Sequence, residues 1–228
     1  MKMEIRQSEQ RFLLLQKFLK ENELGDFQVT PLADDCSFRR YFRVKANEVS
    51  FVVMDAPPEK EDTRLFIAIS KLLNGYGFSA PKVFTVDLLN GFLILEDFGN
   101  ETYTKALSED KDELCLYHLA IDLLINLGRR NYKEEITFLP RYDSRKFLEE
   151  VLLFLDWYLG PRLKIQVSDS MRKEFLSLWK ICLKQFVDGS QSILVLRDYH
   201  VDNLMPVSYT HLRAHETLRY LVCRLLLE

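Results

Sequence analysis

The spacing of apolar residues changes along this chain. Over residues 8–22 they recur every three or four positions, which predicts an amphipathic helix capped by Ser8 and stopped by Gly25. After that helix they gather in short runs typical of β-strands. We expect Asn90-Gly91 to turn a hairpin, and the apolar run 50–54 to be a central strand. The expected strands cover residues 27–29, 41–44, 50–54, 82–86 and 91–96, with a helix over 61–73.

Beyond residue 99 the helical spacing returns. The expected helices cover residues 111–127, 144–158 and 168–187, with Pro140 and Pro161 as breaks. The second helix should bury one apolar face, made of Phe147, Leu148, Val151, Phe154, Trp157 and Tyr158. A short apolar strand, 193–196, follows the helices and leads into a polar loop.

This loop has the residue types and spacing of a phosphoryl-transfer site. Protein kinases use the pattern H-R-D-x-x-x-x-N, in which the Asp accepts a proton from the attacking hydroxyl and the Asn binds Mg²⁺. Asp198 and Asn203 have this spacing, while Leu196 stands in the place of the His. Both residue types are also common in turns, so the spacing alone is weak evidence. His200, inside the loop, either approaches the substrate or makes a supporting hydrogen bond.

The order of the elements indicates the fold class. A β-rich first half, then helices, then a strand and a catalytic loop, is the order of an α+β, protein-kinase-like fold with two lobes. We assign residues 1–98 to a β-rich N-lobe and 99–206 to a partial helical C-lobe that carries the loop. ATP would bind between the lobes, where the connecting segment at Glu96, Asp97 and Phe98 would meet adenine. The letters D-F-G that begin at Asp97 are not the metal-binding motif of kinases, because they precede the catalytic loop.

The turn between the first two strands is a second candidate for phosphate contact. In a kinase-like lobe this turn lies over the phosphates, but here it contains no glycine. The backbone near Ser37, together with Arg39 and Arg40, offers hydrogen-bond donors to phosphate oxygens. The alternative is a polar hairpin with solvated arginines, and the residues themselves favour neither interpretation.

The lysine that kinases place on the third strand is missing from this chain, whose third strand ends at Asp55. The sequence does not choose which other basic residue supplies the charge, or which acidic residue pairs with it. The basic candidates are Lys45, Arg39, Arg40 and Arg43, and the acidic candidates are Glu59, Glu61 and Asp62.

Composition narrows the class of partner. The 228 residues are 47% hydrophobic and 29% charged, with a formal net charge of −3, which gives no support for a nucleic-acid-binding surface. No apolar run approaches the roughly 20 residues that span a bilayer, and the N-terminus lacks the apolar core of a signal peptide. The four cysteines form no C-x-x-C pair, so neither a zinc site nor a disulfide framework is expected. We expect a cytoplasmic protein without nucleic-acid or membrane partners, of undetermined oligomeric state.

The last residues, 207–228, read VSYTHLRAHETLRYLVCRLLLE and resemble a translated sequencing-library adapter. We therefore expect a non-native tail and leave it out of the functional argument. The alternative is a native helix whose apolar stripe consists of Leu218, Leu221, Leu225 and Leu226.

Several strings together resemble one family. They are D-x-SFRRYFR (35–43), VVMDAPP (52–58), GFLILEDFGN-x-TY (91–103), LP-x-YD (139–143), DWY (156–158) and RDY-x-x-x-NLM (197–205). They are similar to the aminoglycoside phosphotransferase-like family, and within it to bacterial kinases that phosphorylate the anomeric hydroxyl of N-acetylmuramate and N-acetylglucosamine. The resemblance implies ATP, Mg²⁺ and a small hydroxylated acceptor, with Asp198 as catalytic base and Asn203 as metal ligand. An aminoglycoside or choline acceptor, or a catalytically silent kinase-like binding module, are the alternatives.

The family pattern also includes a second metal-binding Asp after the catalytic loop, and in this sequence no Asp follows Asp202. The helices that complete the C-lobe in the family pattern are missing too. We therefore expect this chain to be inactive and poorly stable, with apolar surface left exposed.

Overall fold

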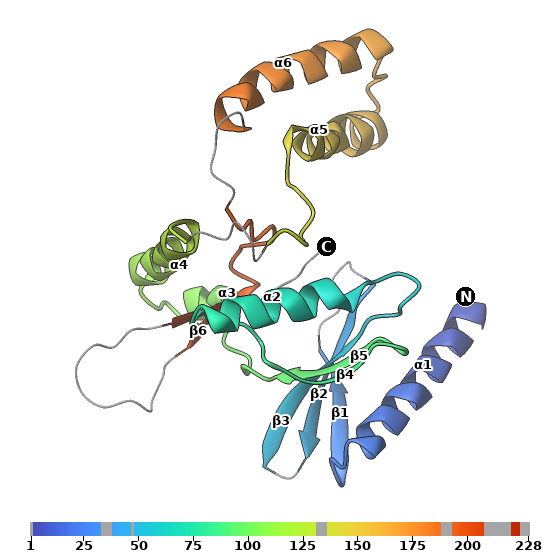
Figure 1. Ribbon diagram of the computed structural model, residues 1–228. Helices are drawn as coiled ribbons and strands as arrows, with labels where there is room; N and C mark the ends of the chain where they lie inside the picture. Colours follow the sequence, from blue (N-terminus) through green and yellow to red (C-terminus); the bar gives the residue numbers. More distant parts are fainter. Residues whose placement is uncertain are drawn as a thin grey trace. The chain divides into compact units, whose positions relative to one another are not determined.

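The computed structural model describes residues 2–32, 38–46, 48–130, 136–187, 193–207 and 220–223 (Figure 1). The chain divides into two compact units, one made of residues 1–126 and 196–228 and the other of residues 127–195. In chain order the elements are α1 (Lys2–Glu21), β1 (Phe27–Pro31), β2 (Arg40–Ala46), β3 (Val49–Asp55), α2 (Thr63–Gly75), β4 (Val83–Asp87), β5 (Phe92–Glu96), α3 (Tyr103–Ser108), α4 (Glu113–Gly128), α5 (Ser144–Leu153), the π-helix η1 (Phe154–Arg162), α6 (Asp169–Val187), β6 (Leu204–Val207) and β7 (Tyr220–Cys223).

A five-stranded antiparallel sheet forms the centre of the first unit. Its strand order is β1-β2-β3-β5-β4, so the apolar run in β3 lies in the middle of the sheet, as the sequence predicts. The β4–β5 hairpin turns at Gly91, where φ is +73°. A Cβ at this position would lie 1.9 Å from the carbonyl oxygen of Ala56, so only glycine fits the close approach of these two backbones.

Helix α1 packs against one face of this sheet. Three of its apolar residues, Leu15, Phe18 and Leu19, are buried in one core with residues of β2, β3 and β5. The ring of Phe18 stacks on Phe92 at a centroid distance of 5.6 Å. The helix begins at Lys2, which makes the predicted cap at Ser8 wrong, because the residues before Ser8 are mostly good helix formers and continue the helix.

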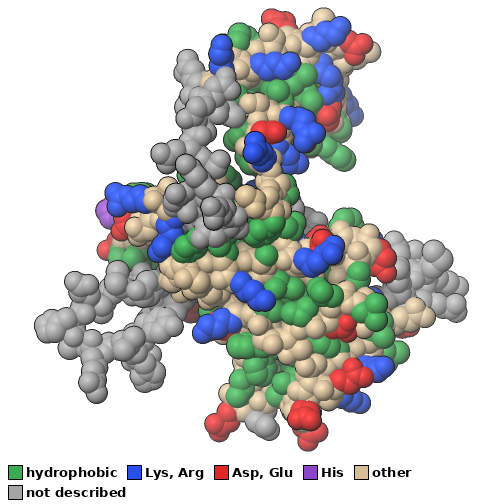
Figure 2. Space-filling view, in the orientation of Figure 1, with side chains coloured by type: hydrophobic (Ala, Val, Ile, Leu, Met, Phe, Trp, Pro, Cys, Tyr) green, Lys and Arg blue, Asp and Glu red, His purple; other side chains and the backbone are tan. Residues whose placement is uncertain are grey.

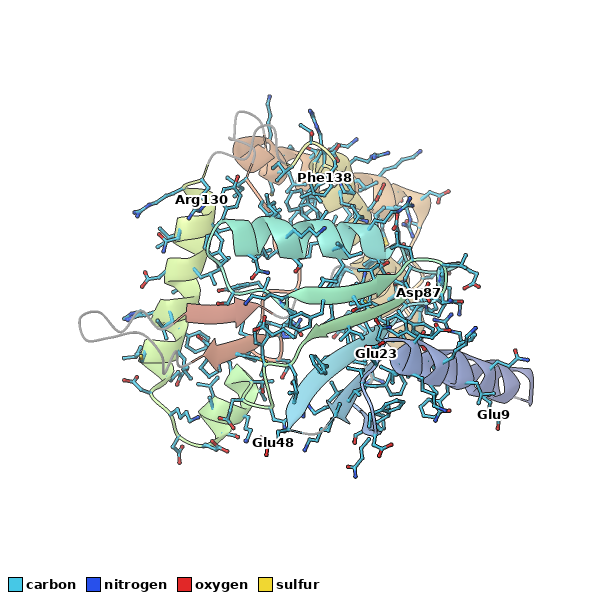
Figure 3. All side chains as sticks on the ribbon, turned by 60° about the horizontal axis from the view of Figure 1, so that its bottom comes forward. Glu9, Glu23, Glu48, Asp87, Arg130 and Phe138 are labelled. Carbon is cyan, nitrogen blue, oxygen red and sulfur yellow. The ribbon has the colours of Figure 1, made fainter. Side chains whose placement is uncertain are left out.

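The opposite face of the sheet is buried as well. Tyr41, Met54 and Leu93 are paired across β2, β3 and β5, and each is at most 5% exposed. Helix α2 runs alongside β4 and β5 in both Figure 1 and Figure 3. Its first turn is capped by the side chain of Asp62, which accepts a hydrogen bond from the backbone amide of Arg64 at 3.0 Å.

The second unit contains α5, η1 and α6. The rings of Phe154 in η1 and Phe175 in α6 stack with centroids 6.2 Å apart. The predicted burial of Trp157 and Tyr158 is wrong, because they are 72% and 49% exposed while Leu155 is buried. In a π-helix each backbone amide bonds to the carbonyl five residues earlier, as Leu163 N does to Tyr158 O. The prediction assumed the four-residue spacing of an α-helix, which does not apply here.

Three further differences concern the chain beyond residue 99. The predicted strand 193–196 is wrong, because in the described part of the chain these residues have no partner strand. A strand instead follows the catalytic loop, where β6 pairs with β7 from the segment 207–228. The six-residue helix α3 is too short to produce a recognisable period in the sequence.

The two compact units are not divided at residues 98 and 99, where we expect the boundary between the lobes. The expected lobe boundary stays a prediction.

Apolar side chains are exposed on the second unit, including Leu153, Leu178 and Ile181. Green atoms mark apolar side chains on the face drawn in Figure 2. Among the described residues, no helix has both the length and the apolar composition needed to cross a membrane.

Candidate active site

The loop at 197–203 is organised by hydrogen bonds between its two candidate residues. The side-chain nitrogen Nδ2 of Asn203 donates to the carbonyl oxygen of Asp198 at 3.0 Å. The same carbonyl accepts from the backbone amide of His200 at 3.1 Å, and the amide of Asn203 donates to the carbonyl of His200 at 2.9 Å. Asn203 is 3% exposed, whereas Asp198 is half-buried. The spacing D-x-x-x-x-N therefore corresponds to a turn that the Asn203 side chain closes onto the backbone of Asp198.

Two contacts attach this loop to helices of the same unit. The hydroxyl of Tyr199 donates to the carbonyl oxygen of Ala120 in α4 at 2.7 Å. At the start of α3, the amide of Thr104 donates to the carbonyl of Val201 at 3.3 Å, and the Thr104 hydroxyl donates to the carboxylate of Asp202. The loop is thus anchored at three residues that follow Asp198, namely Tyr199, Val201 and Asp202.

Asn203 has a donor atom suited to a divalent cation. Its amide nitrogen is used inside the loop, which leaves Oδ1 as the atom that can face a metal ion. Mg²⁺ prefers oxygen ligands and is held through one or two side chains together with substrate phosphates. In the chain as described, no group of three or more His, Cys, Asp or Glu is placed to hold a metal ion. Mg²⁺ at Asn203 would take further ligands from phosphate oxygens and from water.

Arg39 pairs with Glu61 just before helix α2. The guanidinium donates to Oε2 of Glu61 from Nη2 at 2.9 Å and from Nε at 3.1 Å. The Arg39 side chain is 6% exposed and that of Glu61 17%. The sequence left open which basic residue replaces the kinase lysine and which acidic residue pairs with it. Arg39 and Glu61 are candidates that form such a pair, and both are largely buried.

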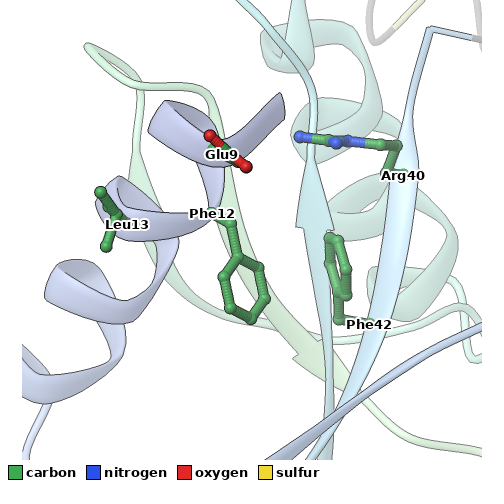
Figure 4. A pocket seen from close by; sticks show the side chains of 5 residues that line it. All are labelled: Glu9, Phe12, Leu13, Arg40 and Phe42. Carbon is green, nitrogen blue, oxygen red and sulfur yellow. The ribbon is translucent and has the colours of Figure 1, made fainter. Parts of the chain in front are cut away.

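Arg40 points the other way, toward α1. Its Nε donates to Oδ2 of Asp55 at 3.1 Å, and Nε of Arg11 in α1 donates to Oδ1 of the same carboxylate at 3.1 Å. Arg40 also lines an open hollow of about 500 Å³ beside α1 and β2, together with Phe12 and Phe42 (Figure 4). Because successive residues of an extended chain face opposite sides, Arg39 and Arg40 lie on different faces of the sheet. Ser37, the third candidate of this turn, lies outside the described residues.

The segment after β5 is tied to the sheet by Arg43. Its guanidinium binds the carboxylate of Asp97 at two points, with Nε–Oδ2 at 2.7 Å and Nη2–Oδ1 at 2.9 Å, and also donates to the carbonyl of Gly99 at 2.8 Å. The hydroxyl of Ser50 donates to the same carboxylate. The Asp97 side chain is thereby used to fix the position of its own segment.

The two other candidates of that segment differ in their surroundings. Glu96 is tied to the residue before β4, because its amide donates to the carbonyl of Lys82 at 2.9 Å and its carboxylate accepts from the amide of Lys82 at 3.3 Å. Phe98 is half-buried. A contact between this segment and a nucleotide stays a prediction.

Asp97 should make the stability of the protein depend on pH. Burial raises its pKa, but hydrogen bonds from Arg43, Ser50 and the amide of Gly99 outweigh that effect and hold the pKa below the ordinary 3.8. The carboxylate therefore stabilises the fold above pH 4, and this stabilisation disappears as the pH falls through the lowered pKa. Asp97→Asn should reduce the free energy of unfolding at pH 7, and the difference from wild type should shrink toward pH 2.

Denaturant unfolding followed by far-UV circular dichroism measures this difference. Asp122→Asn, an exposed substitution on α4, is the control and should have little effect at either pH. A deficit for Asp97→Asn that stays the same from pH 7 to pH 2 would contradict this interpretation.

Sequence reasoning missed the residues that hold the candidates in place. Arg11 is 44 positions from Asp55, and Thr104 is 98 positions from Asp202. Neither pair belongs to a local motif, so spacing gives no signal for either. Only the string GFLILEDFGN-x-TY, which ends one residue before Thr104, indicated that this region matters.

Comparison with known proteins identifies similar sequences over most of the chain. The pattern of one family, described as the phosphotransferase enzyme family, matches residues 28–210. An N-acetylmuramate/N-acetylglucosamine kinase of Pseudomonas aeruginosa is 38% identical over 187 residues, which cover 80% of this chain and 53% of that protein. A kinase of the same name from Neisseria meningitidis is 30% identical and covers 79% of this chain and 53% of its own length. The chain spans about half the length of the curated relatives it matches.

Solved structures are similar in fold. The streptomycin-ATP-APH(2")-IIa ternary complex matches with a TM-score of 0.51 and 17% identity, over 84% of this chain and 65% of that one. A spectinomycin phosphotransferase, APH(9)-Ia, matches with a TM-score of 0.50 and 12% identity, over 88% of this chain and 66% of that one. The α+β, protein-kinase-like fold expected from the order of elements is thereby confirmed.

Proposed function

Because the chain belongs to the phosphotransferase enzyme family, we propose that it carries the sheet and the catalytic loop of an ATP-dependent kinase of small molecules. The acceptor in this proposal is the anomeric hydroxyl of a cell-wall amino sugar, N-acetylmuramate or N-acetylglucosamine. The choice of an amino sugar rests on the four curated relatives, each of which is named N-acetylmuramate/N-acetylglucosamine kinase.

The bond from Asn203 Nδ2 to the Asp198 carbonyl carries the proposal. It closes the turn to which both residues belong, and phosphoryl transfer to a hydroxyl needs the carboxylate of one and the amide oxygen of the other. Asp198 accepts the proton of the acceptor's hydroxyl as that oxygen attacks the γ-phosphate of ATP. Asn203 holds Mg²⁺, which neutralises charge on the phosphates when it is bound. No covalent intermediate on the protein is required.

Arg39 is the residue we assign to the phosphates. Helix α1 covers the sheet face toward which Arg40 points, whereas Arg39 lies on the other face and pairs with Glu61. Protein kinases pair a strand lysine with a helix glutamate for this task. Here an arginine immediately before β2 and a glutamate just before α2 form the corresponding pair. Ser37 and the segment at Glu96, Asp97 and Phe98 remain proposed nucleotide contacts, the first through phosphate and the others through adenine.

Replacing Arg39 with glutamine should weaken the binding of Mg·ATP about tenfold, since a charge-assisted hydrogen bond contributes roughly 1.5–3 kcal/mol. Arg39→Lys should recover part of the loss, because it keeps the charge but not the two-point contact. Titration calorimetry with a non-hydrolysable ATP analogue measures both.

Arg64→Gln is the matched control for this measurement. Arg64 also pairs with a carboxylate at the start of α2, that of Asp62, but its side chain is 76% exposed. It should bind the analogue like wild type. Equal affinity for Arg39→Gln and wild type would remove Arg39 from the nucleotide site.

A single-turnover assay tests the acceptor. The chain in molar excess is incubated with Mg·ATP and one acceptor at a time, and the products are identified by phosphorus NMR. We expect slow formation of a sugar 1-phosphate from N-acetylmuramate or N-acetylglucosamine. Product from an aminoglycoside or from choline, and none from the amino sugars, would favour the other acceptor class. Nucleotide binding without any product would favour a silent binding module.

We also propose a cytoplasmic location, where ATP is available. Cys182 is a free thiol, which suits a reducing compartment.

A further inference from the structure

A chain of side-chain contacts connects helix α3 to the proposed metal ligand. The hydroxyl of Thr104 donates to Oδ1 of Asp202, and Oδ2 of Asp202 lies 3.6 Å from Nδ1 of His200. The other ring nitrogen of His200, Nε2, lies 3.0 Å from Nδ2 of Asn203. Asn203 in turn donates to the carbonyl of Asp198. The sequence of this loop left open whether His200 contacts substrate or gives a supporting hydrogen bond.

The backbone carbonyl of Asp198 decides the orientation of the Asn203 amide. A carbonyl oxygen can only accept a hydrogen bond, so the amide atom that faces it at 3.0 Å is the nitrogen. With the nitrogen turned inward, Oδ1 points away from this carbonyl. The opposite orientation would bring two oxygens together and would remove Oδ1 from the side on which a cation can bind.

The same orientation fixes the tautomer of His200. An amide nitrogen is only a donor, so Nε2 of the ring must accept and carries no proton. The proton of the neutral ring is then on Nδ1, the atom that faces the carboxylate of Asp202. Asp202 favours this tautomer, because its carboxylate, 3.6 Å from Nδ1, attracts the N–H dipole and would repel a lone pair.

We propose that His200 and Asp202 are positioning residues that hold the Asn203 amide in the orientation that presents Oδ1 to a divalent cation. This inference rests on the proposed function, in which Asn203 is a metal ligand. Neither residue touches the cation or the substrate. His200 accepts from the amide, Asp202 orients His200, and Thr104 orients Asp202 from the start of α3. Groups that orient a metal ligand in this way commonly affect metal affinity by 10–100-fold.

The tautomer is tested directly by nitrogen NMR of the histidine side chains. The spectrum of the chain without metal or nucleotide should show one ring with an unprotonated Nε2 and a protonated Nδ1. That signal should disappear in His200→Gln, which identifies it. A proton on Nε2 of His200, with Nδ1 unprotonated, would overturn the proposal.

Metal-dependent nucleotide binding tests the consequence. Calorimetry compares the affinity for a non-hydrolysable ATP analogue in Mg²⁺ and in EDTA. His200→Ala should reduce the gain in affinity from Mg²⁺ about tenfold, the lower end of the range for such residues, while the affinity in EDTA stays the same. His200→Gln should restore most of the gain, because its amide can accept from Asn203 and donate to Asp202 as the ring does.

His118→Ala, an exposed histidine on α4, is the control and should behave like wild type. A gain from Mg²⁺ in His200→Ala that equals that of wild type would overturn the positioning role. A wild-type chain that gains nothing from Mg²⁺ would instead overturn the proposed function, so the two failures are distinguishable. Circular dichroism of each variant shows whether it is folded.

Discussion

Replacing Asp55 with alanine should lower the free energy of unfolding of the sheet-bearing unit by about 3 kcal/mol. The Asp55 side chain is 1% exposed and faces two guanidinium groups, those of Arg11 and Arg40, which are 15% and 31% exposed. Removing the carboxylate leaves two partly buried cations without their common partner. Arg11 also stacks on the ring of Phe92 at 4.6 Å and donates to the carbonyl of Asn90 at 2.8 Å, so the loss should extend to the packing of α1.

This unfolding should be followed by far-UV circular dichroism, because both tryptophans, Trp157 and Trp179, lie in the other unit. Glu21→Ala is the matched control. It removes an exposed carboxylate of α1, 3.7 Å from Lys17, and should cost less than about 1 kcal/mol. A loss in Asp55→Ala no larger than in the control would show that the two arginines do not attach α1 to the sheet.

With Mg²⁺, ATP and either amino sugar, the chain should turn over at least about a thousandfold more slowly than the 1–100 s⁻¹ of ordinary kinases. Kinases hold their metal ions with an Asn of the catalytic loop and with a second Asp that follows it. Asn203 is present, but no Asp occurs after Asp202 in this sequence. The charge that develops on the phosphates would therefore be poorly neutralised.

Release of ADP, measured with and without the sugar, gives this rate. Asp198→Asn serves as the control for contaminating kinases, since any turnover that it retains does not come from the loop. Sugar-dependent turnover within the ordinary range, lost in Asp198→Asn, would contradict the expectation that the chain is inactive.

The sheet was predictable from the sequence because its strands carry strong local signals. The apolar run at 50–54 predicted the central strand, and Asn90-Gly91 predicted the hairpin, in which Gly91 adopts a positive φ. Helices α4 and α6 begin and end within two residues of their predicted limits. These features depend on residues that are neighbours in sequence.

The errors arose where the chain departs from regular geometry or depends on distant partners. The π-helix at 154–162 turned Trp157 outward although its spacing indicated burial. The run 193–196 is apolar enough for a strand, but no strand pairs with it in the described part of the chain. The spacing of apolar residues indicates the local structural preference of a segment. It does not indicate which other segments pack or pair with it.

In the candidate site, too, local features were predictable from the sequence and long-range contacts were not. The spacing of Asp198 and Asn203 predicted a loop that contains both residues, and both lie in one turn. Their roles as base and metal ligand stay predictions. Which arginine pairs with Glu61 was not predictable, because Arg39 and Arg40 are adjacent and differ only in the face toward which they point. The sequence indicated several ion pairs, and three-dimensional contacts were needed to choose among them.

In the proposed function, Asn203 belongs to a site for Mg²⁺ and ATP. Calorimetric titration of the chain with ATP in Mg²⁺ and in EDTA tests this role, with Asn203→Ala as the variant and Asn126→Ala, an exposed asparagine of α4, as the control. Wild type and control should bind more tightly in Mg²⁺, and Asn203→Ala should lose this gain. Equal binding in Mg²⁺ and EDTA by wild type, or an undiminished gain in Asn203→Ala, would rule out Asn203 as the metal ligand.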